Sequence, residues 1–189
     1  MKTLFALFAC ILFSLACNTF TAPELENANI TDTSLVYRQD TLSRNNKLFT
    51  GCIFALHTNG DTALLKSFKG GVEHGITKIW YPNGRLAEER DFENGKKVGL
   101  HKGWWPNGNK KFRYSFKNGE FDGEAKEWYE SGSIFKEFHY EKGYEQGSQK
   151  LWWINGKTRV NYVIKNNRRY GLLGTKNCVN VADSIVSLR

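Results

Sequence analysis

Apolar and polar residues alternate in short runs through the middle of the chain. Phe112, Tyr114 and Phe116 are two residues apart, and so are Phe138 and Tyr140. A period of two places these side chains on one face of a β-strand. The runs are bounded by Asn-Gly and similar dipeptides, which are typical of tight hairpin turns. The pattern predicts consecutive antiparallel β-hairpins.

The turns recur with a fixed period. Glycines stand 24 residues apart, at Gly51, Gly75, Gly99, Gly123, Gly147 and Gly171. A first turn in each unit lies at Asn59-Gly60, Asn83-Gly84, Asn107-Gly108, Ser131-Gly132 and Asn155-Gly156. A second turn lies at Gly70-Gly71, Asn94-Gly95, Asn118-Gly119, Lys142-Gly143 and Asn166-Asn167. Type I′ turns need positive φ at both central residues, so we expect that conformation in Asn107 and Gly108 alike.

The period predicts the architecture of the whole chain. Residues 51–170 are expected to form five 24-residue repeats in an all-β fold, an open, twisted antiparallel sheet of consecutive hairpins. Residues 35–50 resemble the second half of a unit and are predicted to be a degenerate capping half-repeat. Residues 171–189 are predicted to be a C-terminal cap.

The N-terminal segment has the pattern of an export signal. Lys2 precedes an uncharged apolar run that ends near Ala16, too short to span a bilayer. Ser14-Leu15-Ala16-Cys17 resembles a bacterial lipobox, which predicts a lipoprotein signal peptide over residues 1–16 and a lipid on Cys17. The alternative is an ordinary signal peptide, cleaved for example after Ala22. Residues 17–34 are polar and are predicted to be a flexible tether.

Aromatic residues make up 14% of the chain, and all six tryptophans fall where the first strand of a unit ends. The pairs are Trp80-Tyr81, Trp104-Trp105, Trp128-Tyr129 and Trp152-Trp153. Equivalent rings of successive repeats should stack, so we expect the tryptophans to be mostly core. Adjacent residues of a strand point to opposite faces, however. One ring of Trp104-Trp105 and one of Trp152-Trp153 should therefore be less buried and could contact a ligand.

The run Trp80-Tyr81-Pro82-Asn83-Gly84-Arg85-Leu86, followed by Phe92-Glu93-Asn94-Gly95-Lys96-Lys97-Val98-Gly99, resembles the MORN-variant repeat. In particular it resembles secreted bacterial proteins grouped with the YwqK-type antitoxins and with proteins called membrane-binding. The resemblance covers roughly residues 35–176. It implies the repeat fold, and it implies binding to a membrane or the neutralisation of a cognate toxin.

Basic residues exceed acidic ones by 27 to 19, a net charge of +8. One repeat position carries lysine four times, at Lys78, Lys102, Lys126 and Lys150. Two strands advance a sheet by about 10 Å, so these lysines should form a regular column, each beside the tryptophan two residues on. The column predicts a basic, aromatic-lined surface for an acidic protein or anionic phospholipid. Alternatively, it keeps the sheet soluble.

No residue pattern indicates an enzyme. The four histidines, His57, His74, His101 and His139, occupy different repeat positions and lack metal-ligand spacing. We expect no catalytic residue, metal or cofactor. Cys52 and Cys178 flank the repeats, nearly 50 Å apart in a flat sheet of ten strands, so we expect free thiols unless the sheet curls.

These observations predict a lipid-anchored β-repeat scaffold in the bacterial cell envelope, which binds an unidentified protein partner or anionic phospholipid. A soluble secreted or periplasmic protein is the alternative location. An antitoxin or immunity-type protein is the alternative function. Nucleic acid is not expected as a partner, because the chain is predicted to be exported and shows no nucleic-acid-binding module.

Overall fold

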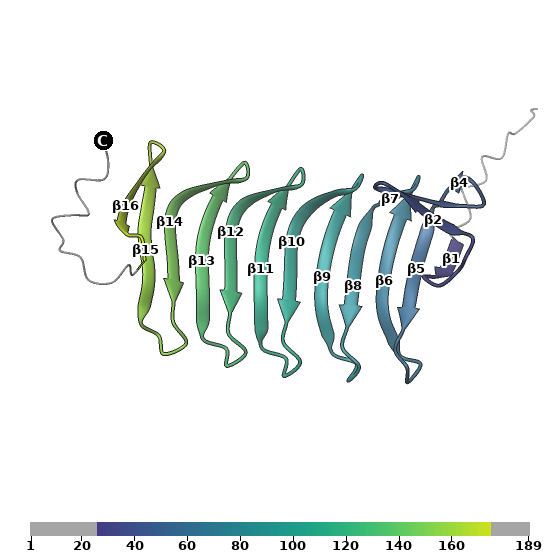
Figure 1. Ribbon diagram of the computed structural model, residues 1–189, viewed down its shortest axis with the longest axis horizontal. Helices are drawn as coiled ribbons and strands as arrows, with labels where there is room; N and C mark the ends of the chain where they lie inside the picture. Colours follow the sequence, from purple (N-terminus) through teal and green to yellow (C-terminus); the bar gives the residue numbers. More distant parts are fainter. Residues whose placement is uncertain (1–25, 175–189) are drawn as a thin grey trace, which may run out of the picture.

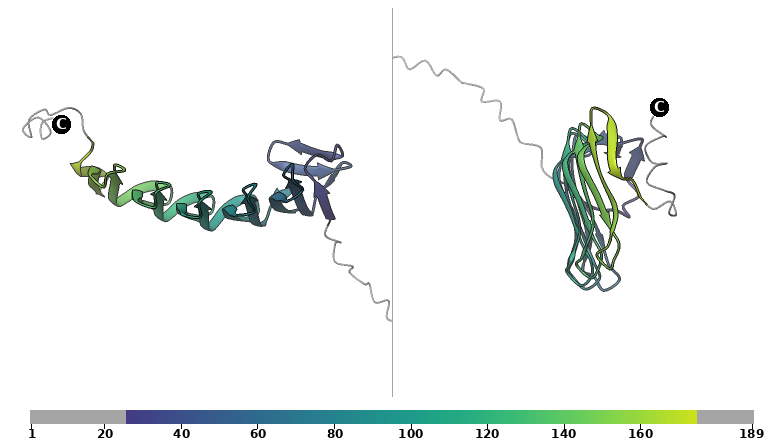
Figure 2. Two further views of the ribbon diagram at one scale, coloured as in Figure 1. Left: turned by 90° about the horizontal axis from the view of Figure 1, so that it is seen from below. Right: turned by 90° about the vertical axis from the view of Figure 1, so that its left-hand side faces the viewer.

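The computed structural model describes residues 26–174, and every regular element among them is a β-strand. A long open main sheet contains 13 strands and a small separate sheet contains three (Figure 1). Figure 2 shows the repeat region as a single layer along its length. The predicted all-β fold, an open antiparallel sheet of consecutive hairpins, is confirmed.

The strands of the repeat region follow one another in chain order and pair antiparallel with their neighbours. They are β5 (Gly51–Leu56), β6 (Thr62–Lys69), β7 (Val72–Glu73), β8 (Gly75–Trp80), β9 (Leu86–Glu93), β10 (Lys96–Trp104), β11 (Lys110–Lys117), β12 (Glu120–Trp128), β13 (Ile134–Glu141), β14 (Tyr144–Trp152), β15 (Thr158–Lys165) and β16 (Arg168–Leu172). Repeats 1 to 5 begin at Gly51, Gly75, Gly99, Gly123 and Gly147.

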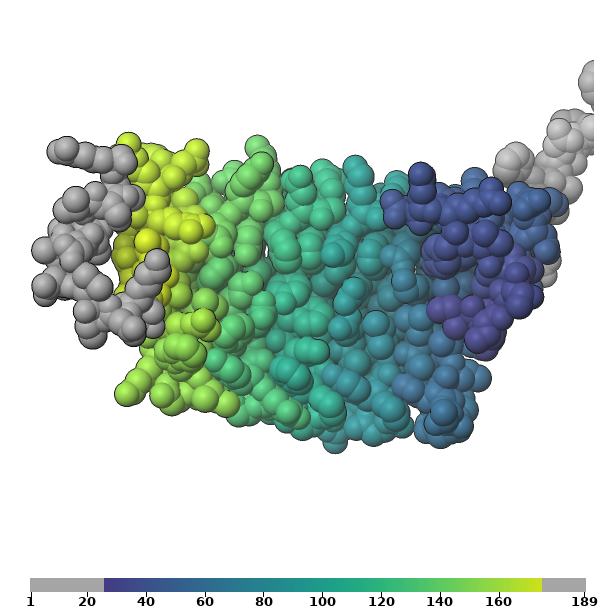
Figure 3. Space-filling model, in the orientation of Figure 1, coloured from purple at the N-terminus to yellow at the C-terminus, as the bar shows by residue number. Residues whose placement is uncertain are grey.

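The N-terminal flank differs from its predicted organisation. β1 (Glu26–Asn29), within the expected tether, pairs in parallel with β5 and extends the main sheet. β2 (Leu35–Arg38), β3 (Thr41–Arg44) and β4 (Lys47–Leu48) form the small sheet instead of a half-repeat. A cluster of buried residues joins this flank to repeat 1: Ala28, Leu42, Phe49, Ile53 and Phe68. In Figure 3 the flank covers only the first repeats, so most of this face of the sheet is open.

The close pairing of β1 with β5 depends on Gly51. Its φ is 151°, and a Cβ there would overlap the backbone of Glu26. A side chain at this position would therefore separate the two strands, which makes Gly51 a requirement of the N-terminal cap.

The second turn of each repeat has the expected chemistry. φ is positive at both residues of all five turns, for example 50° at Asn94 and 77° at Gly95. In four of the five turns the second residue also donates its amide to the preceding unit, for example from Gly95 to the carbonyl of Glu73 at 2.8 Å and from Gly119 to that of Lys97 at 2.9 Å. These type I′ turns both close a hairpin and join one repeat to the one before it.

The prediction for the first turn was wrong, because only its glycine has positive φ. Gly108 has φ of 94°, whereas the φ of Asn107 is not positive. The amide of Gly108 donates to the carbonyl of Trp105 at 2.8 Å, which makes this a longer turn that ends on a left-handed glycine. The Asn107 side chain accepts from the amide of Asn109 at 2.9 Å and donates to the carbonyl of Glu130 at 2.9 Å. Asparagine is thus used here for its side-chain hydrogen bonds.

Burial is concentrated in two columns. The third residue of every repeat is buried: Ile53, Thr77, His101, Ala125 and Gln149. Phe68, Phe92 and Phe116, near the ends of the second strands, are buried as well. His101 lies between two of them, with ring-centroid distances of 5.5 Å to Phe92 and 4.5 Å to Phe116.

The expectation that the tryptophans are mostly core is corrected by the structure. Five of the six are half-buried, and Trp153 is 42% exposed. A single-layer sheet has no second layer to cover such large rings. The third-position residues are buried instead, because each strand bends at the glycine two residues earlier. Gly99, for example, has φ of 64°, and the pairing of β10 with β9 is interrupted between Val98 and Lys102.

Cys52 is half-buried in β5, and its sulfur lies 3.5 Å from the hydroxyl of Ser67. It forms no disulfide within residues 26–174. Cys178 lies outside the described residues, as do Cys17, the predicted signal peptide and most of the predicted C-terminal cap. The predictions about them stay predictions.

Candidate binding groove

The two faces of the main sheet differ in chemistry. Phe112 and Tyr114 of β11 lie opposite Gly103 and His101 of β10, and we call this side the aromatic face. On the other side, the charged face, Lys102 lies opposite Arg113. The strict alternation of the strands creates this division.

A β-bulge adds a further side chain to the aromatic face of each repeat. In β11 the register shifts so that Gly103 pairs with Phe112 and Trp104 pairs with Lys110, which leaves Lys111 unpaired. A bulged residue departs from the alternation of its strand. Lys111 accordingly lies over the ring of Trp105, with its Nζ 4.8 Å from the centroid.

The same contact recurs in the next two repeats with other residue types. Phe135 packs edge-on against Tyr129 at 5.2 Å in repeat 4. Arg159 stacks on Trp153 at 4.5 Å in repeat 5. Repeats 3 and 5 therefore place their own cation on the second ring of their aromatic pair, whereas repeat 4 places a phenyl ring on it.

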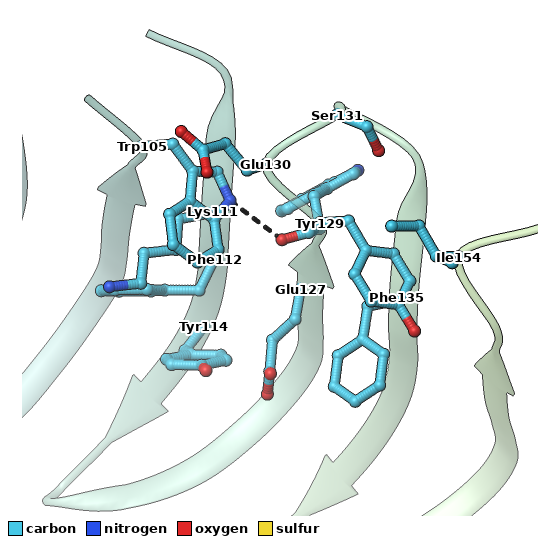
Figure 4. Close-up of a pocket in the computed structure, with 11 residues that line it drawn as sticks. Trp105, Lys111, Phe112, Tyr114, Glu127, Tyr129, Glu130, Ser131, Phe135 and Ile154 are labelled. Atoms are coloured by element: carbon cyan, nitrogen blue, oxygen red, sulfur yellow. Dashed lines mark hydrogen bonds between the residues drawn. The ribbon is translucent and has the colours of Figure 1, made fainter. Parts of the chain in front are cut away.

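A groove of about 510 Å³ opens on the aromatic face between repeats 3 and 4 (Figure 4). Phe112 and Tyr114 form part of one wall and stack at 4.7 Å with an interplanar angle of 12°. Its lining is dominated by aromatic side chains and completed by one aliphatic, one hydroxyl and three charged residues: Trp105, Lys111, Phe112, Tyr114, Glu127, Trp128, Tyr129, Glu130, Ser131, Phe135 and Ile154. Such a concave apolar site with few polar groups is typical of binding sites.

Glu127 is the charged group on the strand that runs beneath the groove. Its Oε1 accepts a hydrogen bond of 3.1 Å from Nζ of Lys136, which also lies 4.8 Å from the ring centroid of Phe138. Burial, and next the Glu127 carboxylate, raise the pKa of Tyr114. The Tyr114 phenol therefore stays protonated at neutral pH and can act as a hydrogen-bond donor in the groove.

A ladder of hydrogen bonds fixes the rings of the aromatic pairs at the end of the aromatic face where the first turns lie. The second residue of each aromatic pair donates to the carbonyl of the first residue in the next repeat's pair. The bond from Trp105 Nε1 to the carbonyl of Trp128 is 3.0 Å and is drawn in Figure 4. The phenols of Tyr81 and Tyr129 make the equivalent bonds to Trp104 and Trp152, each at 2.9 Å. The groove wall is thus held by the fold itself.

The charged face carries the predicted lysine column, but acidic residues interrupt it. One continuous row crosses eight neighbouring strands: Lys78, Glu89, Lys102, Arg113, Lys126, Glu137, Lys150 and Asn161. Glu89 lies 3.7 Å from Nζ of Lys78 and 3.1 Å from that of Lys102. Lys126 lies 3.1 Å from Glu124 and 4.0 Å from Glu137. The recorded partners of these three lysines are carboxylates rather than the neighbouring indoles.

The predicted aromatic residues divide between sites. Trp105 lines the groove, and Trp153, which is exposed, stacks with Arg159 in repeat 5. Trp104 and Trp152 are half-buried. Glu127, Phe135 and Arg113 lie at these sites although the sequence did not single them out as binding residues. A comparison of equivalent positions could have found Glu127, because the other repeats carry Ala55, Ile79, Gly103 and Leu151 there.

Within residues 26–174 no group of three or more His, Cys, Asp or Glu side chains is placed to hold a metal ion. The same part of the chain contains no helix of the length and hydropathy needed to cross a membrane.

Comparisons with known proteins bear on the repeats alone. Residues 73–94, 97–118 and 121–142 match the family model of the MORN repeat variant. A comparison with curated proteins found no match. The grouping with YwqK-type proteins stays a prediction. These central repeats are therefore similar to the MORN repeat variant, and apart from Ile154 the residues that line the groove lie within the matched segments.

Proposed function

We propose that this protein is a non-enzymatic binding scaffold that holds a protein partner in the groove of its aromatic face. The observation that carries the proposal is the groove itself, an aromatic-lined hollow whose walls are fixed by hydrogen bonds between repeats. Repeats of the MORN type are generally used for binding to membranes or proteins, which supports a binding role. An export signal and a lipid on Cys17, as the sequence predicts, would hold the scaffold at the bacterial cell envelope.

The charge pattern favours the groove over the lysine column as the main contact. Glu89 is shared by Lys78 and Lys102, so part of the positive charge of the column is already compensated. The groove, by contrast, offers concave apolar area, which is the usual source of binding free energy.

A second candidate, contact with anionic phospholipid, is favoured by one observation on the charged face. Lys102, Arg113 and Lys126 lie directly opposite one another on three adjacent strands, with no acidic residue between them in the row. Like charges in such a cross-strand position repel each other and attract an anion.

A capture experiment with matched surface variants tests the proposal. Ile154 at the groove and Ile76 on β8, away from it, are both exposed, at 66% and 46%, so aspartate at either site should leave the fold intact. We expect the tagged full chain to capture a partner from envelope extracts, Ile154→Asp to lose it and Ile76→Asp to retain it. If Ile76→Asp alone loses the partner, or neither variant does, the groove is not the binding site.

The antitoxin alternative can be separated in the same experiment. A captured protein that is toxic when expressed alone, and harmless when expressed with this chain, would assign neutralisation as the role of the scaffold.

A further inference from the structure

We infer that the groove receives an arginine side chain of its protein partner, stacked on the aromatic rings and paired with Glu127. This inference rests on the proposed function and adds the chemistry that the groove recognises. It is drawn from the differences between repeat 4 and its neighbours.

The neighbouring repeats show what their aromatic rings bind. In repeat 5 the guanidinium of Arg159 lies 4.5 Å from the ring centroid of Trp153, and in repeat 3 the ammonium of Lys111 lies 4.8 Å from that of Trp105. Cations are attracted to aromatic faces at such distances. In repeat 4 the equivalent residue is Phe135, so within the described residues the ring of Tyr129 carries no cation from its own repeat. The cation of this repeat, Lys136, lies instead beside Glu127 and over Phe138.

Repeat 4 also has a carboxylate that the other repeats lack. The equivalents of Glu127 are alanine, isoleucine, glycine and leucine. Lys136 donates to Oε1 of Glu127, and the pKa of the nearby Tyr114 phenol is raised by burial and next by the same carboxylate. Repeat 4 thus leaves the Tyr129 ring without a cation and keeps one oxygen of Glu127 that Lys136 does not bind, beside a groove that is open to solvent.

Arginine fits this combination better than lysine does. Its guanidinium is planar, so it stacks on an aromatic face, and its donors are arranged in a fork that matches a carboxylate. Arginine is also among the residues that contribute most to protein interfaces. The two basic neighbours leave room for it: Lys111 is held on Trp105, and Lys136 occupies only one oxygen of Glu127.

Two small probes that differ in charge test the inference on the full chain. N-acetyl-arginine amide carries the guanidinium, and N-acetyl-citrulline amide is its neutral analogue of the same shape. We expect saturable NMR shifts of the Ile154 methyl groups, with affinity for the arginine probe roughly tenfold higher, as a charge-assisted hydrogen bond provides. Equal affinity for the two probes, or no shift with the arginine probe, would overturn the inference.

Three variants locate the preference. Glu127→Gln keeps the shape of the side chain and should remove the preference for arginine over citrulline. Phe135→Arg should place a cation on the Tyr129 ring, as Arg159 does on Trp153 in repeat 5, and block the arginine probe. Glu124→Gln, on the charged face with its side chain 48% exposed, is the control and should bind as the unmodified chain does. A preference that survives Glu127→Gln, or that disappears in the control, contradicts the assignment.

The two experiments distinguish a failure of the arginine preference from a failure of the proposed function. If Ile154→Asp loses the captured partner while both probes bind equally, the groove is a protein-binding site that does not select arginine. If the arginine probe binds while Ile154→Asp still captures the partner, the cation site exists and the partner binds elsewhere.

Discussion

The phenol of Tyr129 donates a hydrogen bond of 2.9 Å to the backbone carbonyl of Trp152, 23 residues further along the chain. Tyr81 does the same to Trp104 at 2.9 Å, and in repeat 3 the indole of Trp105 reaches Trp128 at 3.0 Å. A phenol and an indole are thus interchangeable at this position, because each has an apolar body and one donor at its far end. The bond connects each repeat to the next at the edge where the groove lies.

Removing one of these donors should destabilise the array. We expect Tyr129→Phe to lower the free energy of unfolding by about 1 kcal/mol, since the Trp152 carbonyl loses its side-chain partner. Urea unfolding followed by tryptophan fluorescence measures this change. Tyr144→Phe is the control, because Tyr144 is 80% exposed. Equal stability of the two variants would show that the bond contributes nothing.

The glycine of the first turn should tolerate substitution less well than the asparagine of the second turn. Gly108 has φ of 94°, so Gly108→Val should cost about 1–3 kcal/mol by straining a β-branched residue. Asn118→Lys in the second turn is the matched control, because Lys142 occupies the equivalent place with φ of 48°. Thermal melting compares the two. A larger loss from Asn118→Lys than from Gly108→Val would contradict the turn assignments.

Stability should fall in mild acid because of His101. This side chain is buried, its Nε2 lies 2.9 Å from the carbonyl of Asp91, and burial lowers its pKa below the ordinary value of 6.5. The unfolded chain then binds more protons than the folded one, so stability decreases as pH falls from about 6.5 towards the lowered folded pKa.

His101→Gln isolates this contribution from the other histidines. Gln149 occupies the equivalent position of repeat 5 and donates to the carbonyl of His139 at 2.8 Å, so glutamine fits the site. Unfolding free energies measured between pH 7.5 and 5 should fall less steeply for the variant. Parallel curves for both chains would assign the acid sensitivity elsewhere.

The lysine column should control any affinity for anionic membranes. Replacing Lys78, Lys102, Lys126 and Lys150 by glutamine should leave the melting temperature almost unchanged, because partly exposed ion pairs contribute little. Sedimentation with phosphatidylserine vesicles at low salt should show binding reduced roughly tenfold or more, since basic residues near such a surface contribute about 1 kcal/mol each. If the unmodified chain does not bind, or binds equally, the column serves solubility.

Cys17→Ser should release the protein from the membrane fraction. The prediction follows from Ala16-Cys17 at the end of the apolar run. Labelled fatty acid should be incorporated into the unmodified chain and not into the variant. A variant that stays in the membrane fraction at high salt, together with an unlabelled unmodified chain, would exclude lipidation at this residue.

The sequence predicts the repeat fold well because period and turn chemistry are local. Asn94-Gly95 and Asn118-Gly119 have the φ values that their residue types favour. The same dipeptide at Asn107-Gly108 serves a longer turn, and the difference depends on how the flanking strands pair.

The groove could not be predicted from the sequence for a related reason. Lys111 and Phe135 would face away from Phe112 in an alternating strand, and the bulge that brings them to the aromatic face has no simple residue signature. The burial of His101 likewise depends on the bend at Gly99 and on packing between Phe92 and Phe116, which residue types alone do not indicate. Residue types alone therefore identify the strands and turns, and not the surface that the strands create.

The hydrogen bonds from the amide of Gly95 to the carbonyl of Glu73, and from that of Gly119 to that of Lys97, join equivalent atoms of successive repeats. Gly143 and Phe121 form the same hydrogen bond between repeats 4 and 3, so the first four repeats share one type of joint. Unequal duplication within the gene, in steps of one 24-residue unit, could insert or remove a repeat without a new type of contact at either side. The groove would then be inherited or lost as a discrete unit, because it needs only repeats 3 and 4 and the start of the turn that follows β14.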